Sequence, residues 1–392
     1  MPETPALQSL KNHRFSGDER PLAPASSRLA ARILAVTLAL VPMAGAPGEW
    51  VLQDTLKSTL LALGVLYAAI AWGWMALRGE DAPRFKLHGI LLFPTVLCAY
   101  ALGSMAWSHT YLAGVEACRW ALLGVLLWVT LQVVCKETVL SIVVGIHIGA
   151  VGASAWVAAQ FWGNLDWFPQ AAVPASTFAN RNFFAEYLVC TLPFSAYLLV
   201  QLKSPRWRQL MALSLAFNIV ALMMSGTRSA LVAACLVGPA LLFAIWRFRN
   251  ALAVSGWSTG SRWSCLLVLV AGVLSLGALP TRHPVLLADS FGTTPLERSV
   301  LRAGSMAKTT EYTVGSFSIR SSMWRSTARM MMANPRTGVG AGAWEVHIPL
   351  YQGWNNSLET DFYAHNEFLQ LMGEYGLPVG GEPWRYSWPT CS

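Results

Sequence analysis

The sequence predicts an all-α fold: a polytopic transmembrane helical bundle of about nine spans, with a long, partly helical polar loop near the C-terminus. Hydrophobic residues make up 54% of the 392 residues and charged residues only 12%, whereas soluble domains carry about 25% charged residues. The charges lie between long apolar runs, and the chain after residue 280 is far more polar than the chain before it. These three observations point to a membrane bundle with one large extramembrane segment.

Nine apolar windows are about as long as a helix that spans a bilayer, which takes about 20 residues. They define a predicted transmembrane bundle over residues 33–280. The first is short and contains Pro42. The windows lie near Ile33–Ala46, Leu56–Leu77, Leu87–Trp107, Cys118–Cys135, Val139–Trp162, Phe183–Leu202, Gln209–Ser225, Ser229–Phe248 and Trp263–Leu279.

The distribution of Lys and Arg predicts the orientation of the bundle. If the connecting segments alternate between the two sides, fifteen basic residues fall on the side of the N-terminus and four in the short loops of the other side. Because basic residues stay in the cytoplasm, we expect residues 1–32 to be a cytoplasmic tail and the segment after Leu279 to lie outside. Residues Pro42–Ala46 also look like a cleavage site, but the long polar stretch before them favours an uncleaved first helix. The net charge of +8 therefore indicates topology, and no nucleic-acid partner is expected.

The outer segment, residues 281–378, is predicted to hold most of the chemistry. Apolar positions recur at helical spacing over Ser318–Ala333, and the Asn-Pro pair that follows ends this helix. Thr337–Gly342 reads as a glycine-rich turn, and Asp361–Tyr375 as a second helix. Residues 379–392 are rich in Pro and Trp and show no pattern, so they read as an atypical tail from a truncated or frameshifted reading frame.

Two groups of arginines are candidates for binding an anion. Arg228 lies between two apolar windows on the side where basic residues are scarce, so it is either a snorkelling residue at a helix end or a clamp for phosphate, which a guanidinium binds with two hydrogen bonds. Arg320 opens the 318–333 helix; Arg325 and Arg329 share a face of it, and Arg320 lies close to the Arg325 side. This group is either a solvated basic face or a second phosphate contact.

One histidine has a polar and aromatic setting that suggests chemistry. His365 can act as a base or a hydrogen-bond donor near neutral pH. On the expected helix, Asn366 and Gln370 share a face, and Asp361 lies four residues before His365, where it could orient the ring. The plainer interpretation is a structural histidine.

A single carboxylate enters an apolar window. Glu186 lies one turn into its helix, so it is either paired with Arg181, the reading we favour, or lines a polar cavity.

The natural ligand of such an outer face is an anionic group at the bilayer surface, such as a lipid-linked phosphate or diphosphate. No nucleotide-binding loop, acidic metal motif or nucleophilic serine elbow is present. Six of the seven cysteines lie in or at the ends of apolar windows, and no Cys/His ligand spacing occurs. Neither a cofactor nor a metal is expected.

Four stretches resemble the O-antigen ligase/polymerase family of bacterial envelope glycosyltransferases. The resemblance extends over about residues 139–380 and depends on the order and spacing of these short motifs. The stretches are Ser176–Ala185, Ser225–Ala230, Ile319–Trp324 with Asn334–Gly342, and His365–Leu377.

The resemblance implies a GT-C-like architecture and a transferase of the bacterial inner membrane, with the large loop in the periplasm. The implied reaction moves a glycan from undecaprenyl diphosphate to a hydroxyl of lipid A-core or of a growing O-unit, with inversion and without a metal. Arg228 and Arg320 would hold the diphosphate, and His365 would activate the acceptor. The supporting substrate-binding positions would be Asn366, Arg181 and Arg325, with Glu367 beside them.

Alternatives remain open from the sequence. The acceptor could be a protein Ser or Thr, as in a protein O-oligosaccharyltransferase. A transporter or flippase for lipid-linked glycans is a different class, but it requires ionisable residues near the midplane, and these are almost absent here. Because family members usually continue into further helices after Gly380, an inactive truncated member is the third alternative.

Overall fold

A computed structural model of the chain describes residues 23–48, 52–78, 85–307, 315–353 and 363–377. These residues are helical or irregular, and the only β feature among them is an isolated bridge between Ala172 and Asn180. The all-α prediction is confirmed. The first 22 residues, Asp361 and the atypical tail 379–392 lie outside the described residues.

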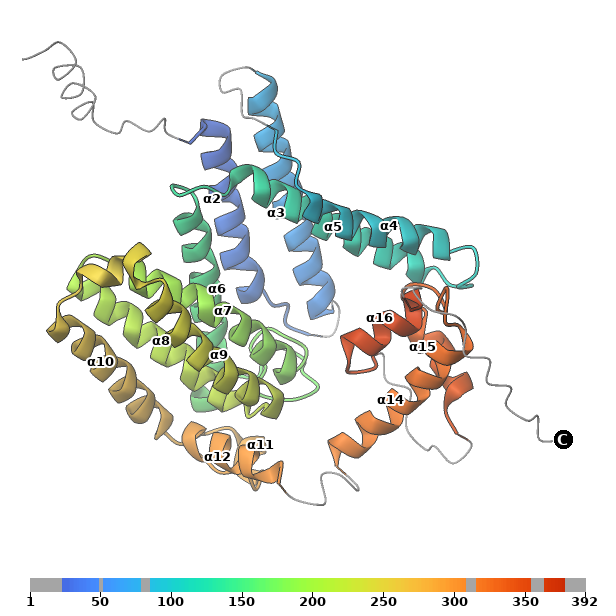
Figure 1. Cartoon of the computed structure of the whole chain (residues 1–392). Coiled ribbons are helices and arrows are strands. Elements are labelled where there is room, and N and C mark those ends of the chain that lie inside the picture. The colour runs from blue at the N-terminus through green and yellow to red at the C-terminus, as the bar shows by residue number, and fades with distance from the viewer. Residues whose placement is uncertain (1–22, 49–51, 79–84, 308–314, 354–362, 378–392) are drawn as a thin grey trace, which may run out of the picture.

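Each of the nine apolar windows contains a helix (Figure 1). Among the described residues, eight helices are long and apolar enough to cross a membrane. The nine helices are α2 (Ala25–Leu40, extended by a 3₁₀ turn, Val41–Met43), α3 (Gln53–Leu77), α4 (Leu92–Ser104), α5 (Leu112–Val133), α6 (Val139–Gly163), α7 (Arg181–Gln201), α8 (Pro205–Ser225), α9 (Arg228–Arg247) and α10 (Thr259–Gly277).

Two helices begin well before the hydropathy windows suggest, and the others begin within about one turn of them. α2 starts at Ala25, so the end of the predicted tail, Arg28 to Arg32, is already helical. α5 starts at Leu112 and includes Glu116 and Arg119, which form an ion pair within the helix. A pair of opposite charges three residues apart is compatible with a helix end, although it lowers the hydropathy of the window.

The third predicted span is shorter than expected. Only Gly89–Ser104 is helical, first as a 3₁₀ turn and then as α4, and this is below the length of the other spans. α4 and α5 nevertheless form an antiparallel hairpin. An extended stretch before α4 continues alongside α5, so the two arms of the hairpin have similar lengths. The Gln132 side chain at the end of α5 makes two hydrogen bonds to the backbone of Lys86, of 2.8 and 2.7 Å.

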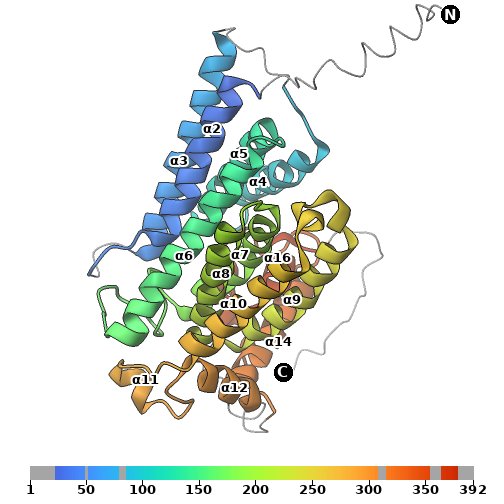
Figure 2. The same ribbon diagram turned by 90° about the vertical axis from the view of Figure 1, so that its left-hand side faces the viewer.

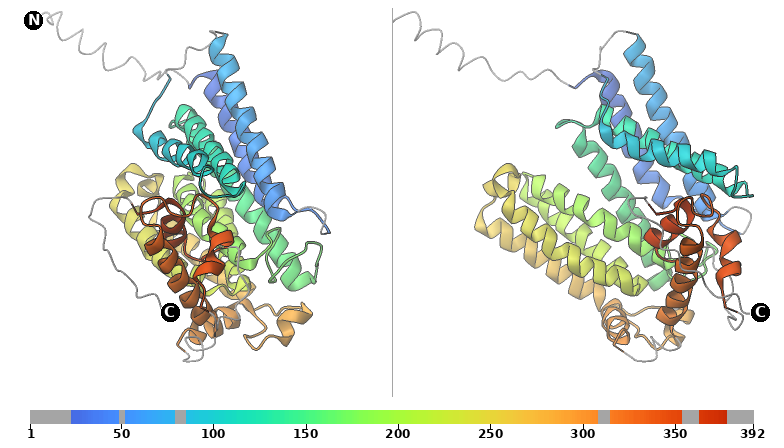
Figure 3. Two further views of the ribbon diagram at one scale, coloured as in Figure 1. Left: turned by 90° about the vertical axis from the view of Figure 1, so that its right-hand side faces the viewer. Right: turned by 45° about the vertical axis from the view of Figure 1, so that its right-hand side comes forward.

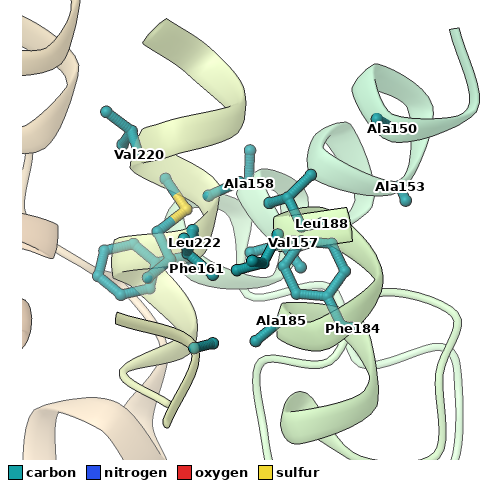
Figure 4. Packing of buried hydrophobic residues seen from close by; sticks show 14 of the residues in the cluster. Ala150, Ala153, Val157, Ala158, Phe161, Phe184, Ala185, Leu188, Val220 and Leu222 are labelled. Atoms are coloured by element: carbon teal, nitrogen blue, oxygen red, sulfur yellow. The ribbon is translucent and has the colours of Figure 1, made fainter. Parts of the chain in front are cut away.

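The best-packed core lies between α6, α7 and α8. Figure 4 shows Phe161 of α6, Phe184 and Leu188 of α7, and Leu222 of α8 meeting in it, and all four are almost fully buried. Small residues on α6 let α2 approach: a Cβ on Gly145 would lie 2.2 Å from the Ala35 carbonyl oxygen. Close backbone approach at small residues is the usual mode of helix packing in membranes.

A polar link crosses this core. The two ring nitrogens of His147 lie 2.9 Å from Ser195 Oγ and 3.0 Å from Ser214 Oγ, so one histidine on α6 bridges α7 and α8. His147 is thus a hydrogen-bonded histidine inside the bundle.

The rest of the bundle surrounds this core with much thinner packing. α2, α3 and α5 share a second cluster that includes Leu34, Val65 and Val129, and α2, α3 and α6 run side by side in Figure 2. Only 6% of the α9 window is buried, and Leu236 on it is 70% exposed. So much exposed apolar surface fits a lipid environment rather than water.

Contacts between helix ends divide the bundle into two sides. On one side, Lys57 reaches Thr177, Thr281 bonds to Phe161, and Thr227 bonds to Asn182. On the opposite side, Gln132 bonds to Lys86 and Arg208 bonds to Ser261. We call the first side, where the segment after α10 lies, the loop side.

The segment after α10 contains short helices gathered at the loop side (Figure 3). Its own small core includes Met330, Trp344 and Ile348. The elements are α11 (Pro284–Ala288), α12 (Pro295–Ser305), α14 (Ser316–Ala333), α15 (Trp344–His347), a 3₁₀ turn (Ile348–Tyr351) and α16 (Glu367–Tyr375). The predicted 318–333 helix is therefore present, and it ends before Asn334 as expected.

Candidate active site

Helix α14 holds the turn that carries His365. The indole nitrogen of Trp324 donates a hydrogen bond of 3.0 Å to the Ala364 carbonyl, and the Ala364 N–H donates to Gln370 Oε1 at 3.1 Å. Ala364 is completely buried, while His365 beside it is exposed. Both the N–H and the carbonyl of Ala364 are thus hydrogen-bonded. These bonds hold the backbone beside His365 in one conformation.

The second predicted helix begins later than expected. It starts at Glu367 rather than Asp361, because Asn366 caps it: Asn366 Oδ1 accepts from the Leu369 N–H at 3.2 Å. His365 lies just before the cap with φ of +51°, a left-handed conformation that His adopts more readily than most residues. His365 and Asn366 therefore lie on a turn, and the predicted pairing of Asn366 with Gln370 on one helix face is wrong.

The His365 turn and α14 come close to the membrane bundle at Glu186. The charged groups that act on the Glu186 carboxyl are Glu367, Arg320 and His365. Arg181 is not among them, and no ion pair joins the two within the described residues, so the favoured pairing of Glu186 with Arg181 is wrong. Glu186 is exposed on α7 in the absence of lipid, and it marks the seam between bundle and loop.

Two transmembrane helices begin at the same place on the loop side. Arg181 is the first residue of α7 and Arg228 the first of α9. The Asn180 side chain caps α7 by accepting from the Asn182 N–H at 2.9 Å, and the Thr227 hydroxyl lies 3.2 Å from Asn182 Oδ1. The positive ends of two helix dipoles and two guanidinium groups therefore converge, which is a favourable setting for an anion.

Helix α12 adds two arginines that the sequence analysis did not select. Arg298 and Arg302 both donate to Asp289 Oδ2, at 3.3 and 2.8 Å. Arg298, Arg228 and Asp289 all act electrostatically on Arg181. The sequence did contain a signal, because Thr294 and Glu297 form a capping box that predicts a helix with Arg298 and Arg302 one turn apart on one face.

The glycine-rich turn attaches the loop to the α4–α5 hairpin. Gly338, Gly340 and Gly342 have positive φ. The Gly340 N–H bonds to the Glu374 carbonyl oxygen at 3.0 Å, and the Ala341 N–H bonds to Ser104 Oγ at 3.1 Å. Because these donors are occupied within the protein, the turn is a structural joint.

Glu374 is the buried centre of this joint. It is 5% exposed, and its Oε2 accepts from the Gly342 N–H at 2.9 Å while its Oε1 accepts from Gln370 at 3.1 Å. Burial raises the pKa of Glu374 to about 7. The neighbouring Tyr375 hydroxyl accepts from the Trp120 indole at 2.7 Å, which ties α16 to α5.

A buried lysine organises the segment that leads into α7. Lys57 Nζ donates to the Ala44 carbonyl and to Thr177 Oγ1, both at 2.7 Å, and lies 4.5 Å from the centre of the Phe178 ring. Thr177 in turn bonds to the Pro42 carbonyl. The 176–182 stretch is therefore pinned to the ends of α2 and α3, which positions Arg181.

The three arginines predicted on α14 differ in their surroundings. Arg325 is exposed on α14, and Arg329 donates to the Tyr351 carbonyl at 3.3 Å. Arg320 is half-buried and is the member of this set that acts on Glu186. The structure thus brings Arg181, Arg228, Arg320 and His365 to the loop side but leaves Arg325 outside the contacts described. Within the described residues, no group of three or more His, Cys, Asp or Glu side chains is placed to hold a metal ion.

Comparison with known proteins gives one match. Residues 213–380 match the family model described as O-antigen ligase, so the resemblance seen in the sequence is confirmed over that range. The matched range includes Arg228, Arg320 and His365, while the 176–185 stretch lies before it. No curated protein and no solved structure matches the chain.

Proposed function

We propose that this membrane protein, which matches the family model described as O-antigen ligase over residues 213–380, transfers a glycan from undecaprenyl diphosphate to an acceptor hydroxyl. The acceptor is lipid A-core or the end of a growing O-unit. One observation carries the proposal: α7 begins at Arg181, beside Arg228 at the start of α9, and in its second turn presents Glu186 to Arg320 and His365. A donor with its lipid in the bilayer and its glycan outside presents its diphosphate at this depth.

The arginines fit the charge that such a transfer develops. When the bond between the anomeric carbon and the diphosphate oxygen breaks, negative charge grows on the leaving diphosphate. Arg228 and Arg320 supply guanidinium groups there, and the N-terminus of α9 adds its dipole. Preorganised positive groups stabilise such a transition state more than the ground state, so no metal is needed to hold the leaving group.

His365 and Glu186 fit the acceptor half of the reaction. The acceptor hydroxyl must lose its proton as its oxygen attacks the anomeric carbon from the face opposite the diphosphate, which inverts the configuration. An exposed imidazole on a fixed turn can accept that proton. The Glu186 carboxylate interacts electrostatically with His365, so it stabilises the imidazolium that forms.

The orientation of the chain follows from the charge pattern. We propose that the N-terminus lies in the cytoplasm of a bacterium and that the loop side faces the periplasm across the inner membrane. The side opposite the loop carries the basic ends, such as Arg208 and Lys136, that the positive-inside rule assigns to the cytoplasm. The donor glycan and the acceptor then meet on the periplasmic side.

Site-directed variants in a reconstituted transfer assay test this function. With a purified lipid-diphosphate glycan as donor and lipid A-core as acceptor, Arg228→Ala, Arg320→Ala and His365→Ala should each reduce product formation at least 100-fold or so. Arg249→Ala and His88→Ala are matched controls, because both residues are exposed and distant from the seam. Full activity of any one of the three variants would remove its assigned role, and absence of transfer by the wild-type chain with both acceptor types would contradict the function.

A further inference from the structure

Helix α12 covers the turn that leads into α9. A Cβ built on Gly226 would lie 3.4 Å from Arg302 Cγ and 3.8 Å from a terminal nitrogen of Arg298. The helix is firmly placed, with a capping box at its start and contacts with α8 and α9. Its two arginines are therefore held directly above the Ser225–Arg228 turn.

These two arginines are buried far more than is usual for this residue type. The Arg298 side chain is 0% exposed and the Arg302 side chain 10% exposed. The Arg302 guanidinium carbon lies 3.6 Å from the centre of the Phe291 ring. The Nε atoms of both arginines are buried without a hydrogen-bond partner among the described residues. Buried charged groups are normally fully paired, so these two retain unused donor capacity.

One carboxylate serves this cluster of guanidinium groups. A single oxygen of Asp289 accepts from both Arg298 and Arg302. Arg181 lies close enough to lower the pKa of Arg302, which burial and this neighbour bring to about 10. All three arginines remain charged at neutral pH, so positive charge exceeds the one negative charge of Asp289 among these four residues.

We propose that Arg298, Arg302 and Arg181 form an anion site in which Asp289 is a resident counter-ion. In the empty protein Asp289 neutralises the α12 arginines. When a lipid diphosphate binds, its phosphate oxygens take the guanidinium donors, and Asp289, which is 21% exposed, gives up its shared contact. This inference deepens the proposed function, on which it rests, by assigning one phosphate of the donor to α12.

The chemistry favours a diphosphate over a monoanion. Guanidinium groups bind phosphate with paired, charge-assisted hydrogen bonds. The diphosphate of a glycosyl donor carries two negative charges and the spent lipid diphosphate up to three, whereas the Asp289 carboxylate carries one. The resident carboxylate also limits how tightly the spent lipid diphosphate is held, which favours its release after transfer.

Binding measurements on three variants test the proposal. The probe is undecaprenyl diphosphate, added to the full chain in nanodiscs, with dissociation constants measured by its tryptophan fluorescence or by microscale thermophoresis. Arg298→Gln and Arg302→Gln should each weaken binding by about tenfold or more, as expected for loss of a charge-assisted contact. Asp289→Asn should tighten binding by about tenfold, since it removes the competing carboxylate. Arg249→Gln, an exposed arginine at the opposite end, is the matched control.

The direction of the Asp289→Asn effect separates a binding site from a structural clamp. If Asp289 only fastens α12, its loss should lower the melting temperature and leave or weaken binding. If it is a counter-ion, undecaprenyl diphosphate should raise the melting temperature of Asp289→Asn more than that of the wild type. An equal or smaller rise, or unchanged affinity in both arginine variants, would overturn the proposal.

The same preparations keep this test separate from the proposed function. If the variants change lipid diphosphate affinity as expected but the wild type transfers no glycan, the proposed reaction fails and the anion site stands. If transfer is normal and the affinity for undecaprenyl diphosphate is unchanged in the Arg298, Arg302 and Asp289 variants, the proposed anion site fails and the proposed reaction stands.

Discussion

At the scale of single residues, Glu186 shows how a position in the fold changes an interpretation. The sequence placed it next to Arg181, and a local ion pair was the simplest prediction. In the structure the groups that act on it, Arg320 and His365, come from more than a hundred residues away. A carboxylate in this position is better suited to support His365 than to neutralise Arg181.

We expect Glu186→Gln to lower the turnover number by about 10- to 100-fold, the range of a lost contribution to acid–base catalysis. The Michaelis constant for the donor should change much less, because the diphosphate contacts come from arginines. Steady-state kinetics over a range of pH measures both. Glu345→Gln, on α15 in the same loop, is the control, and a large change in the donor Michaelis constant with normal turnover would place Glu186 in donor binding instead.

Glu374 provides a pH prediction for the loop. Its folded-state pKa of about 7 lies above the ordinary value of 4.5, so the folded loop binds a proton more tightly than the unfolded chain. Loop stability should therefore be greatest below about pH 4.5, fall as the pH rises towards 7, and level off above it. The Gly342 N–H donates a hydrogen bond to the Glu374 carboxyl. The hydrogen exchange rate of this amide therefore measures how loop stability changes with pH.

The variant Glu374→Gln should remove that slope, because its side chain does not titrate. Exchange of the Gly342 amide would then depend on pH only through the intrinsic chemistry of exchange. A wild-type loop whose protection rises between pH 4.5 and 7 would show that the carboxylate, rather than the carboxylic acid, is the favoured folded form.

At the scale of elements, the sequence predicted helices well where packing is regular and less well where side chains set the ends. The α14 periodicity and its Asn-Pro end were readable from the chain. The start of α16 was not, because Asn366 was interpreted as a helical position when it is a cap. Helix α12 was missed since its buried face carries Arg298 and Arg302 with Pro295 and Ser305, a pattern that hydrophobic periodicity does not detect.

The glycine turn makes the element-scale prediction. Gly338 has φ of +57°, and a Cβ on it would lie 2.2 Å from the Glu374 carbonyl oxygen. Gly338→Ala should therefore detach the turn from α16, with a cost of about 1–2 kcal/mol from backbone strain alone and more from the clash. Limited proteolysis should cut the loop faster, and transfer should fall.

Gly353→Ala is the control for this variant, since nothing lies within 4 Å of a Cβ built there. If Gly338→Ala cleaved no faster than Gly353→Ala, the turn would not be the joint that holds the loop on the α4–α5 hairpin.

At the scale of the whole molecule, the motif residues could be identified from the sequence but their assembly could not. Arg228 and His365 stand out by their settings, yet nothing in the order of residues shows that α7 and α9 begin side by side. That arrangement depends on long-range contacts such as Thr227 with Asn182 and Lys57 with Thr177. Such contacts join short polar side chains whose types are common throughout the chain, so they leave no local pattern.

The path of α4 decides the topology of the whole chain. By length α4 is the weakest of the nine segments, yet its end at Ser104 bonds to Ala341 of the loop, while Lys86 before it bonds to Gln132 at the other end of the hairpin. The two ends of α4 therefore contact opposite sides of the bundle, as in a crossing. If all nine segments cross, the N-terminus and the loop lie on opposite sides of the membrane.

Cysteine labelling in intact cells tests this path. In a chain whose native cysteines are replaced by serine or alanine, Tyr111→Cys, at an exposed position in the α4–α5 turn, should react with a membrane-impermeant maleimide from outside. Leu87→Cys, exposed before α4, should react only after the membrane is permeabilised. Labelling of both from the same side would mean that α4 enters and leaves the membrane on one side. The loop and the N-terminus would then share a compartment, and the assembled site could not face the periplasm while the basic segments stay in the cytoplasm.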